Sequence, residues 1–380
     1  MPHPLRIAML VSGTGINGAI VHSLLLMRFL ASRGHSILLL HRPDAWIAAQ
    51  PGLENVDRFA TSFGRSPREL IRVTRTINTF DPQVLHTHMS SAHTYGMLTR
   101  ILSRRPVVAT AHSQSLQLHW CFNNIVIATS DAAADHHHRT NLVRRAALRT
   151  QPNFIDPKAF PVPSPVQRQA ARASLGIADD AFVVGSVGFI DGRKNQIDLV
   201  HALGGLVRSV PNTRLLLVGG HNTDYMADLL RIADALGVRE HLVMTGVRTD
   251  IAHLLAAMDV YALVSRKESG PLSVLEAMAT GLPVLATDVG MLPEFVRDGS
   301  GGHIVKVGDT HAMTEKLVAL AQDSARRTAM GVAAHAIVTG DYSIDRIGPQ
   351  TEAILAEAAA QRNRPLLGFV AGLVGRQKGH

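Results

Sequence analysis

The sequence predicts an α/β protein with two Rossmann-like domains, and three observations carry this prediction. Its 380 residues suffice for two hydrophobic cores of ordinary domain size. In both halves, short apolar runs alternate with helical stretches, which is typical of βαβ units around a parallel sheet. A segment with five prolines, Pro152–Pro165, separates the halves as a stiff, non-helical connector. We therefore expect domains at residues 1–160 and 161–343, followed by a helical tail at 344–380.

The composition indicates a soluble, cytoplasmic protein with an acidic partner. Hydrophobic residues make up 46% and charged residues 18% of the chain, and no uncharged apolar run reaches the ~18–20 residues that span a bilayer. The single cysteine, Cys121, excludes an internal disulfide and fits a reducing compartment. The net charge of +8 suits membrane headgroups, nucleic acid or phosphorylated substrates. With only 4% aromatic residues, platforms that stack nucleic-acid bases are not expected.

The first half begins with a strand that ends in a glycine-rich loop. The strands predicted there are Arg6–Val11, Ser36–Leu40, Val84–His88, Val107–Thr110 and Ile125–Ala128. Gly13–Gly18 matches the G-x-G-x-x-G pattern of dinucleotide-binding folds and precedes a helix that ends near Gly34. The second strand runs into His41 and Arg42 instead of an acidic residue, so the carboxylate that binds the NAD ribose is missing. The loop is a candidate ligand site, but NAD is not the expected ligand.

A basic helix is predicted between Gly64 and Pro82, with Ser66 as its N-cap. Arg68, Arg72 and Arg75 share one face of this helix, and Arg65 lies just ahead of it. The face is either an ordinary solvated surface or a patch for acidic lipid headgroups or an anionic acceptor. Further arginines follow at Arg100, Arg104, Arg105, Arg139, Arg144, Arg145 and Arg149.

Several histidines lie near predicted strand ends. His86 and His88 belong to one strand, and His112 follows the next one. Residues two apart on a strand need a further ligand to bind a metal, and none lies nearby in sequence, so no metal site is predicted there. The tract Asp135–His138 resembles a metal-binding run, but consecutive helical residues point in different directions and cannot converge on one ion.

The second half predicts another parallel sheet whose loops meet at one edge. Its strands are expected at Val183–Gly188, Arg214–Val218, Leu242–Met244 and Val260–Val264. The loops after them carry Arg193 and Lys194, then Gly219, then Arg248. Because each loop follows a strand, all of them converge on the edge where open α/β sheets bind ligands.

The stretch Lys267–Pro283 is the most informative of the chain. Gly270 and Pro271 suit a tight turn into a helix over Leu272–Thr280, which Gly281 ends. Helix N-termini hold phosphate, whereas carboxylates such as Glu268 and Glu276 accept hydrogen bonds from hydroxyls. The combination suits a nucleotide sugar. A capping box from Ser273 to Glu276 is the structural alternative for Glu276.

The spacing of these residues resembles the signature of glycosyltransferase family 4. It comprises Glu268 and Glu276 with seven residues between them, Ala277-Met278-Ala279, Gly281, Pro283-Val284, Ala286-Thr287-Asp288-Val289-Gly290 and Pro293-Glu294. The resemblance covers nearly the whole chain and is strongest from Leu215 to Val307. It implies a GT-B fold, with two Rossmann-like domains that face each other across a cleft and a C-terminal helix that crosses back to the first domain.

The resemblance also implies a function. We expect retaining, metal-independent transfer of a hexosyl group from a nucleotide diphosphate sugar to a hydroxyl of a glycan or lipid-linked acceptor, as in polysaccharide or lipopolysaccharide biosynthesis. Neither a metal nor another cofactor is expected, and no Asp-x-Asp motif occurs. The expected partners are the nucleotide sugar, the acceptor and, by peripheral contact, the anionic inner face of the membrane, but no nucleic acid.

The resemblance assigns the site residue by residue. Lys194 would neutralise the donor diphosphate with help from Arg193, Glu276 would hold the nucleotide ribose, and His112 would hydrogen-bond the donor sugar. The remaining donor contacts would come from Gly15, Gly219, Arg248, Glu268 and the amides of Ser269, Gly270 and Leu272.

Two departures from the family pattern leave rival functions open. Phe189 stands where the family often has an arginine, and Phe154 replaces the glycine of a Pro-Asn-Gly segment. A degenerate, non-catalytic transferase that serves as a binding partner is one alternative, and Phe189 is its main support. A sugar-nucleotide epimerase on the same fold is the other.

Overall fold

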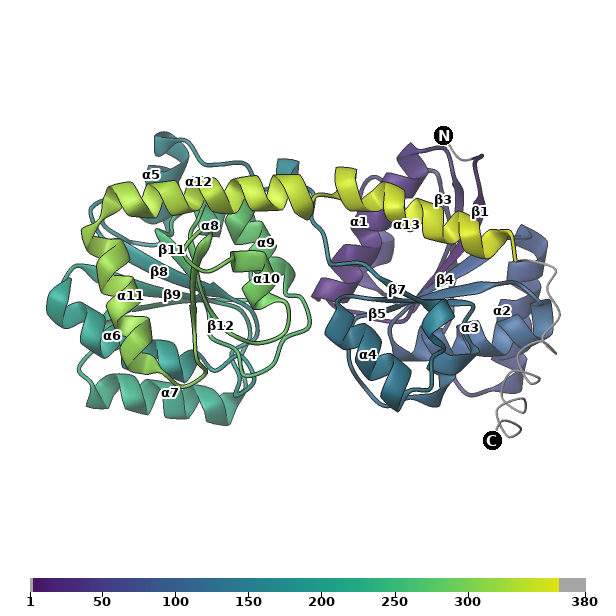
Figure 1. Cartoon of the computed structure of the whole chain (residues 1–380), viewed down its shortest axis with the longest axis horizontal. Coiled ribbons are helices and arrows are strands. Elements are labelled where there is room, and N and C mark those ends of the chain that lie inside the picture. Colours follow the sequence, from purple (N-terminus) through teal and green to yellow (C-terminus); the bar gives the residue numbers. More distant parts are fainter. Residues whose placement is uncertain (1–2, 362–380) are drawn as a thin grey trace, which may run out of the picture. The chain divides into compact units, whose positions relative to one another are not determined.

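The computed structural model describes residues 3–361, which form two compact units (Figure 1). Among the described residues, unit 1 comprises residues 3–151 and 348–361, and unit 2 comprises residues 152–347. Each contains its own parallel sheet, so the prediction of two Rossmann-like domains is confirmed.

The sheet of unit 1 has seven parallel strands in the order β3-β2-β1-β4-β5-β6-β7. The order reverses between β1 and β4, so the carboxyl ends of these two strands form the switch point where such sheets bind ligands. The five predicted strands are confirmed to within one residue, whereas β3 and β7 were missed. The strands are β1 (Arg6–Val11), β2 (Ser36–His41), β3 (Val56–Ala60), β4 (Val84–His88), β5 (Val107–Ala111), β6 (Ile125–Ala128) and β7 (Leu148–Thr150).

Two helices of unit 1 begin at a side-chain cap, and a third begins at the predicted Ser66, which makes no cap hydrogen bond. Asn17 accepts a hydrogen bond from the amide of Ile20 at 3.1 Å, and Ser130 accepts one from Ala133 at 3.1 Å. Ser66 occupies the predicted N-cap position of the basic helix, followed by Pro67. The helices are α1 (Gly18–Ser32), α2 (Pro67–Phe80), α3 (Ser90–Ser103) and α4 (Asp131–Thr140).

The C-terminal helix α13 (Ile344–Ala359) packs on unit 1 from Gly348 onward (Figure 1, yellow). Its Glu352 lies 2.9 Å from His35 Nε2 and 3.3 Å from Arg33 Nε. The amide of Leu5 donates to His35 Nδ1, so the Nε2 proton is directed at the carboxylate of Glu352. The helix thus returns to the first unit as the resemblance implies. Residues 362–380 of the predicted tail lie outside the described residues.

The sheet of unit 2 has six parallel strands in the order β10-β9-β8-β11-β12-β13, with its switch point between β8 and β11. The four predicted strands are confirmed, and β12 and β13 were not predicted. The strands are β8 (Phe182–Val187), β9 (Thr213–Val218), β10 (Leu242–Gly246), β11 (Val260–Leu263), β12 (Val284–Thr287) and β13 (Gly302–Val305).

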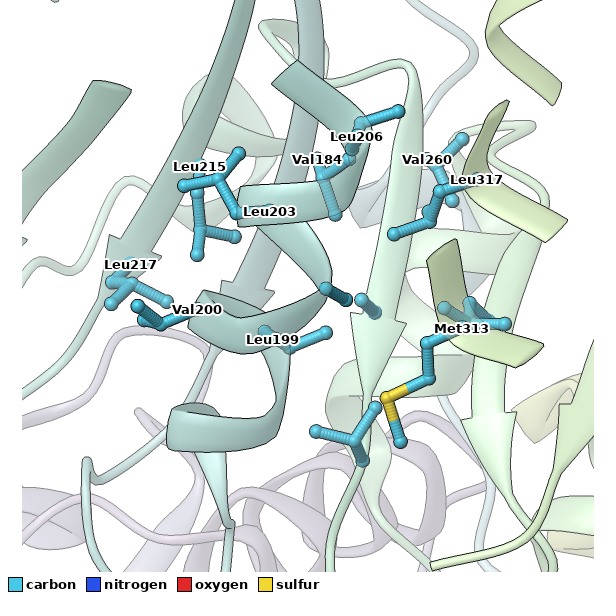
Figure 2. Close-up of a cluster of buried hydrophobic side chains, with 14 of the residues drawn as sticks. Val184, Leu199, Val200, Leu203, Leu206, Leu215, Leu217, Val260, Met313 and Leu317 are labelled. Atoms are coloured by element: carbon cyan, nitrogen blue, oxygen red, sulfur yellow. The ribbon is translucent and has the colours of Figure 1, made fainter. Parts of the chain in front are cut away.

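Helices on unit 2 bury an aliphatic core against this sheet. Leu199, Val200, Leu203 and Leu206 of α6 pack among residues of β8, β9, β11 and α11, such as Leu217 (Figure 2). Apolar residues recur every three to four positions along α6, which places them on one face of the helix. The helices are α5 (Pro165–Ser174), α6 (Gln196–Ser209), α7 (Thr223–Ala235), α8 (Ile251–Ala256), α9 (Leu272–Ala279), α10 (Leu292–Val296), α11 (Thr310–Gln322) and α12 (Ser324–Asp341).

The proline-rich connector starts on unit 2. The backbone of Ile155 exchanges hydrogen bonds with Tyr342 and Ile344, and Phe154 is fully buried. Phe154 therefore fills part of the core at the position where the family pattern has glycine. None of the helices within residues 3–361 is long and apolar enough to cross a membrane.

Candidate functional site

The loops of unit 2 converge at the switch point of its sheet, as the sequence predicts. Gly188 and Gly219 directly follow β8 and β9, with φ angles of +148° and +144°. A Cβ on Gly219 would lie 2.1 Å from the carbonyl oxygen of Gly188, so only glycine allows the two strand ends to approach this closely.

Three predicted site residues form one ion cluster at this edge. Glu268 Oε1 lies 2.8 Å from Lys194 Nζ and 2.9 Å from Arg193 Nη1. The side chains of Glu268 and Lys194 are 7% and 10% exposed, whereas that of Arg193 is 48% exposed. Asp191 Oδ1 accepts a hydrogen bond from the amide of Lys194 at 2.8 Å and so fixes the loop that carries both cations. The cluster concentrates positive charge on a carboxylate that little water reaches.

The turn before α9 is held from two sides. Asn153 Nδ2 donates to the carbonyl oxygen of Gly270 at 2.6 Å, and a Cβ on Gly290 would lie 2.1 Å from the carbonyl oxygen of Glu268. α9 starts at Leu272, where the sequence predicted it, with Pro271 at the N-cap. The first amides of a helix have no acceptor within the helix, so this turn presents donors beside the ion cluster.

Glu276 does not act as a helix cap. Pro271 occupies the N-cap position and makes no side-chain cap bond, so the capping box from Ser273 to Glu276 is absent. Glu276 is partly buried, and its removal from water raises its pKa to about 7. A carboxylate with this pKa changes charge in the physiological range and is a ready acceptor for hydroxyl hydrogen bonds.

Tyr261 lies beneath the site and was missed by sequence reasoning. Its hydroxyl donates to the carbonyl oxygen of Val187 at 3.2 Å, and its side chain is fully buried in β11. Burial raises its pKa, which a hydrogen bond with Ser273 lowers in part. The residue therefore links the end of β8 to the first turn of α9. A buried tyrosine in a strand gives no sequence signal that separates this role from core packing.

Phe189 and Val247 form an exposed apolar surface next to the cluster. They are 51% and 75% exposed, and both flank Gly220, whose Cβ would lie 3.4 Å from each of them. The predicted donor residue Arg248 pairs with Asp250 at 2.5 Å, which balances its charge. This apolar surface suits contact with the flat face of a nucleotide base better than contact with a phosphate group.

Gly15 and His112 belong to unit 1. Gly15 is exposed in the loop between β1 and α1, and a side chain there would enter open space. His112 follows β5 and lines a pocket of about 320 Å³ at the switch point between β1 and β4, together with Ser12, Met89, Ser90, His93 and Trp120. Burial lowers the pKa of His112 to about 4, so its ring is neutral at physiological pH.

Two family models match this chain in adjacent parts. The model described as Glycosyltransferase Family 4 matches residues 16–159, and the model described as Glycosyl transferases group 1 matches residues 167–336. Together they leave out β1 at the start of unit 1 and α13 at its end.

Relatives of this chain include a protein named as a mannosyltransferase and one named as a synthase. The chain is 31% identical over 211 residues to a GDP-mannose-dependent monoacylated alpha-(1-6)-phosphatidylinositol monomannoside mannosyltransferase of Corynebacterium glutamicum, which is 54% of this chain and 55% of that protein. It is 28% identical over 286 residues to an N-acetyl-alpha-D-glucosaminyl L-malate synthase of Bacillus anthracis, with 71% of this chain and 74% of that protein covered. The chain thus spans about half the length of the first relative and three quarters of the second.

Solved structures agree in fold. The structure of Anabaena Alr3699/HepE in complex with UDP and glucose superposes with a TM-score of 0.83 and 23% identity, over 93% of this chain and all of that one. Sucrose-phosphate synthase from Thermosynechococcus elongatus gives a TM-score of 0.78 and 21% identity, over 93% and 99% of the two chains. These likenesses confirm the GT-B fold.

Proposed function

Because the chain belongs to glycosyltransferase family 4, we propose that it transfers a sugar from a nucleotide diphosphate sugar to a hydroxyl of a glycan or lipid-linked acceptor. We further propose that the configuration of the sugar is retained and that no metal assists the transfer. The observation that supports this most is the ion cluster of Lys194, Arg193 and Glu268 beside the start of α9. It provides two cations and helix amides for a diphosphate, and a carboxylate for sugar hydroxyls.

The proposed mechanism is electrostatic. When the bond between sugar and diphosphate breaks, negative charge grows on the leaving diphosphate, and Lys194, Arg193 and the amides of α9 stabilise it. The diphosphate competes with Glu268 for Lys194 and Arg193. Once released from these cations, the carboxylate of Glu268 turns toward the donor sugar. A phosphate oxygen of the donor accepts the proton of the attacking hydroxyl, so no protein nucleophile takes part.

A panel of nucleotide sugars tests the function. We expect at least one of them to be hydrolysed slowly without acceptor, to release nucleoside diphosphate faster with a glycan or lipid-linked acceptor, and to do so in EDTA. Loss of activity in EDTA that manganese or magnesium restores would contradict metal independence. Conversion of the donor to an epimer without release of diphosphate would instead favour an epimerase.

The affinity for nucleoside diphosphate is expected to depend on Glu276. Its carboxylate accepts hydrogen bonds from the ribose only when ionised, and its pKa is raised to about 7. Affinity should therefore be highest above pH 8 and fall by up to about tenfold by pH 6, as the group takes up a proton. Calorimetry across this range with wild type and Glu276→Gln separates this effect from titration of the ligand itself. If both proteins show the same pH profile, Glu276 does not contact the ribose.

The acceptor side is proposed to meet an anionic membrane through α2. Arg65, Arg68 and Arg75 are exposed, and Ile71 between them is 48% exposed, as on helices that rest on lipid headgroups. Arg72 contributes less than the sequence suggested, because it pairs with Glu69 at 2.8 Å and lies over the ring of Phe59. That pair lowers the pKa of Glu69 to about 2.

Liposome sedimentation tests this contact. At low salt we expect the protein to sediment with vesicles that contain anionic lipid, since each arginine near such a surface contributes about 1 kcal/mol. Changing Arg65, Arg68 and Arg75 to Ser should abolish sedimentation. The matched control changes Arg208, Arg231 and Arg239, three exposed arginines of unit 2, and should have little effect. Wild-type protein that ignores anionic vesicles would show that α2 is only a solvated face.

A further inference from the structure

Three histidines from separate elements meet inside unit 1. His22 comes from α1, His88 ends β4, and His112 follows β5. One ring nitrogen from each residue can be chosen so that all three lie within 4.8 Å of one another. Sequence reasoning dismissed His88 and His112 as metal ligands because no third ligand was near in the chain. The fold supplies that ligand, because α1 packs beside β4 and brings His22 over the end of the strand.

The spacing of the rings matches a tetrahedral metal site. With Zn–N bonds of about 2.0–2.1 Å, the ring centroids of three tetrahedral ligands lie about 5.2 Å apart. The observed centroid separations are 4.9 Å for His22 and His112, 5.4 Å for His88 and His112, and 5.8 Å for His22 and His88. The three rings are therefore spaced as the ligands of one tetrahedral ion would be.

Two of the three ring nitrogens already lie close together. His88 Nδ1 lies 3.1 Å from His112 Nε2, so one proton bridges two nitrogens that both point at the same spot. A cation would replace that proton, which can move to the other nitrogen of its ring.

We propose that His22, His88 and His112 bind a divalent transition-metal ion of the zinc class. Three imidazoles without a carboxylate favour Zn²⁺, Co²⁺, Ni²⁺ or Cu²⁺ and discriminate against Mg²⁺ and Ca²⁺, which prefer oxygen ligands. His112 also lines the pocket at the switch point of unit 1, together with Ser12 and Met89, so the site borders a space that can hold a water molecule as fourth ligand.

The proposed ion differs in role from the two cations that would hold the diphosphate. The diphosphate would be held by Lys194 and Arg193 of unit 2, whereas all three histidines belong to unit 1. The proposed ion therefore does not replace the cations that stabilise the leaving group, although it engages His112, which the resemblance assigns to the donor sugar. The inference does not depend on the transferase function, since it concerns binding of the metal alone.

Metal binding to the full-length protein tests the proposal. After removal of metals with a chelator, equilibrium dialysis against Zn²⁺ should give one tightly bound ion per chain. His22→Gln and His112→Gln should each weaken binding by at least ~100-fold, because two ligands remain. The matched controls His201→Gln and His311→Gln change exposed histidines and should bind as wild type does. Unchanged binding in His22→Gln and His112→Gln would overturn the site.

Cobalt spectroscopy gives a readout that needs no variant. Co²⁺ bound by three imidazoles and water is tetrahedral and should produce strong visible absorption, which Zn²⁺ then displaces. Circular dichroism of the metal-free variants shows whether they are folded. If they are not, the wild-type spectrum decides, and weak octahedral absorption or no binding would overturn the proposal.

Discussion

Replacing Lys194 by methionine is expected to lower kcat/KM for sugar transfer by a factor of roughly 10²–10³. Lys194 carries the most buried cation of the ion cluster, with a side chain only 10% exposed. In such a place its charge acts on the leaving diphosphate with little screening by water. Methionine keeps the length and apolar stem of the side chain and removes only the charge, so the loss reports electrostatic stabilisation.

The control is Lys267→Met, which removes an exposed lysine from the same loop as Glu268. It should stay within about threefold of wild type because an exposed charge is screened. Separate kcat and KM values show where Lys194 acts: a loss in kcat indicates an interaction that strengthens in the transition state, and a loss in KM alone indicates uniform donor binding. An unchanged kcat/KM in Lys194→Met would remove this residue from the catalytic machinery.

The sequence predicts most of the strands that are buried on both faces, although it missed the equally buried Val284–Thr287. Val84–His88 and Ile125–Ala128 are buried throughout, and their apolar runs place them correctly. The missed strand Val56–Ala60 lies at an edge and has polar, exposed residues, so it lacks the apolar run that marks a central strand. The missed β7 has only three residues.

The candidate site is predictable where its residues lie in consecutive loops. Lys194, Glu268 and the start of α9 follow strands that meet at one edge, so the sequence alone brings them together. Asn153 and His22 escape such reasoning. Asn153 reaches Gly270 across 117 positions, and His22 joins His88 only because α1 packs on β4. Contacts of this kind depend on packing between elements that no local pattern encodes.

Replacing Asp259 by alanine is expected to destabilise unit 2 by about 3–5 kcal/mol. Asp259 accepts hydrogen bonds from Arg168 at 2.6 Å, Arg172 at 2.8 Å and the amide of Val183 at 2.8 Å. The side chain of Arg172 is only 1% exposed, so removal of the carboxylate leaves a buried guanidinium without its counter-charge. Arg172 also donates to the carbonyl oxygens of Ala257 and Ala181, which hold it in place and prevent it from turning toward water.

Urea unfolding followed by circular dichroism measures this loss as a lower midpoint of the unit 2 transition. The control Asp228→Ala breaks an exposed ion pair, in which Asp228 lies 3.2 Å from Arg231 and the two side chains are 62% and 72% exposed. Its cost should stay below about 0.5 kcal/mol, since water and salt already screen that pair. If the two variants shift the midpoint equally, burial of Arg172 does not set the stability of unit 2.

A double variant, Asp259→Leu with Arg172→Met, provides the converse test. This variant removes both buried charges and leaves Arg168, whose side chain is 33% exposed, without its partner. It should therefore be more stable than Asp259→Ala although it lacks the ion pair altogether.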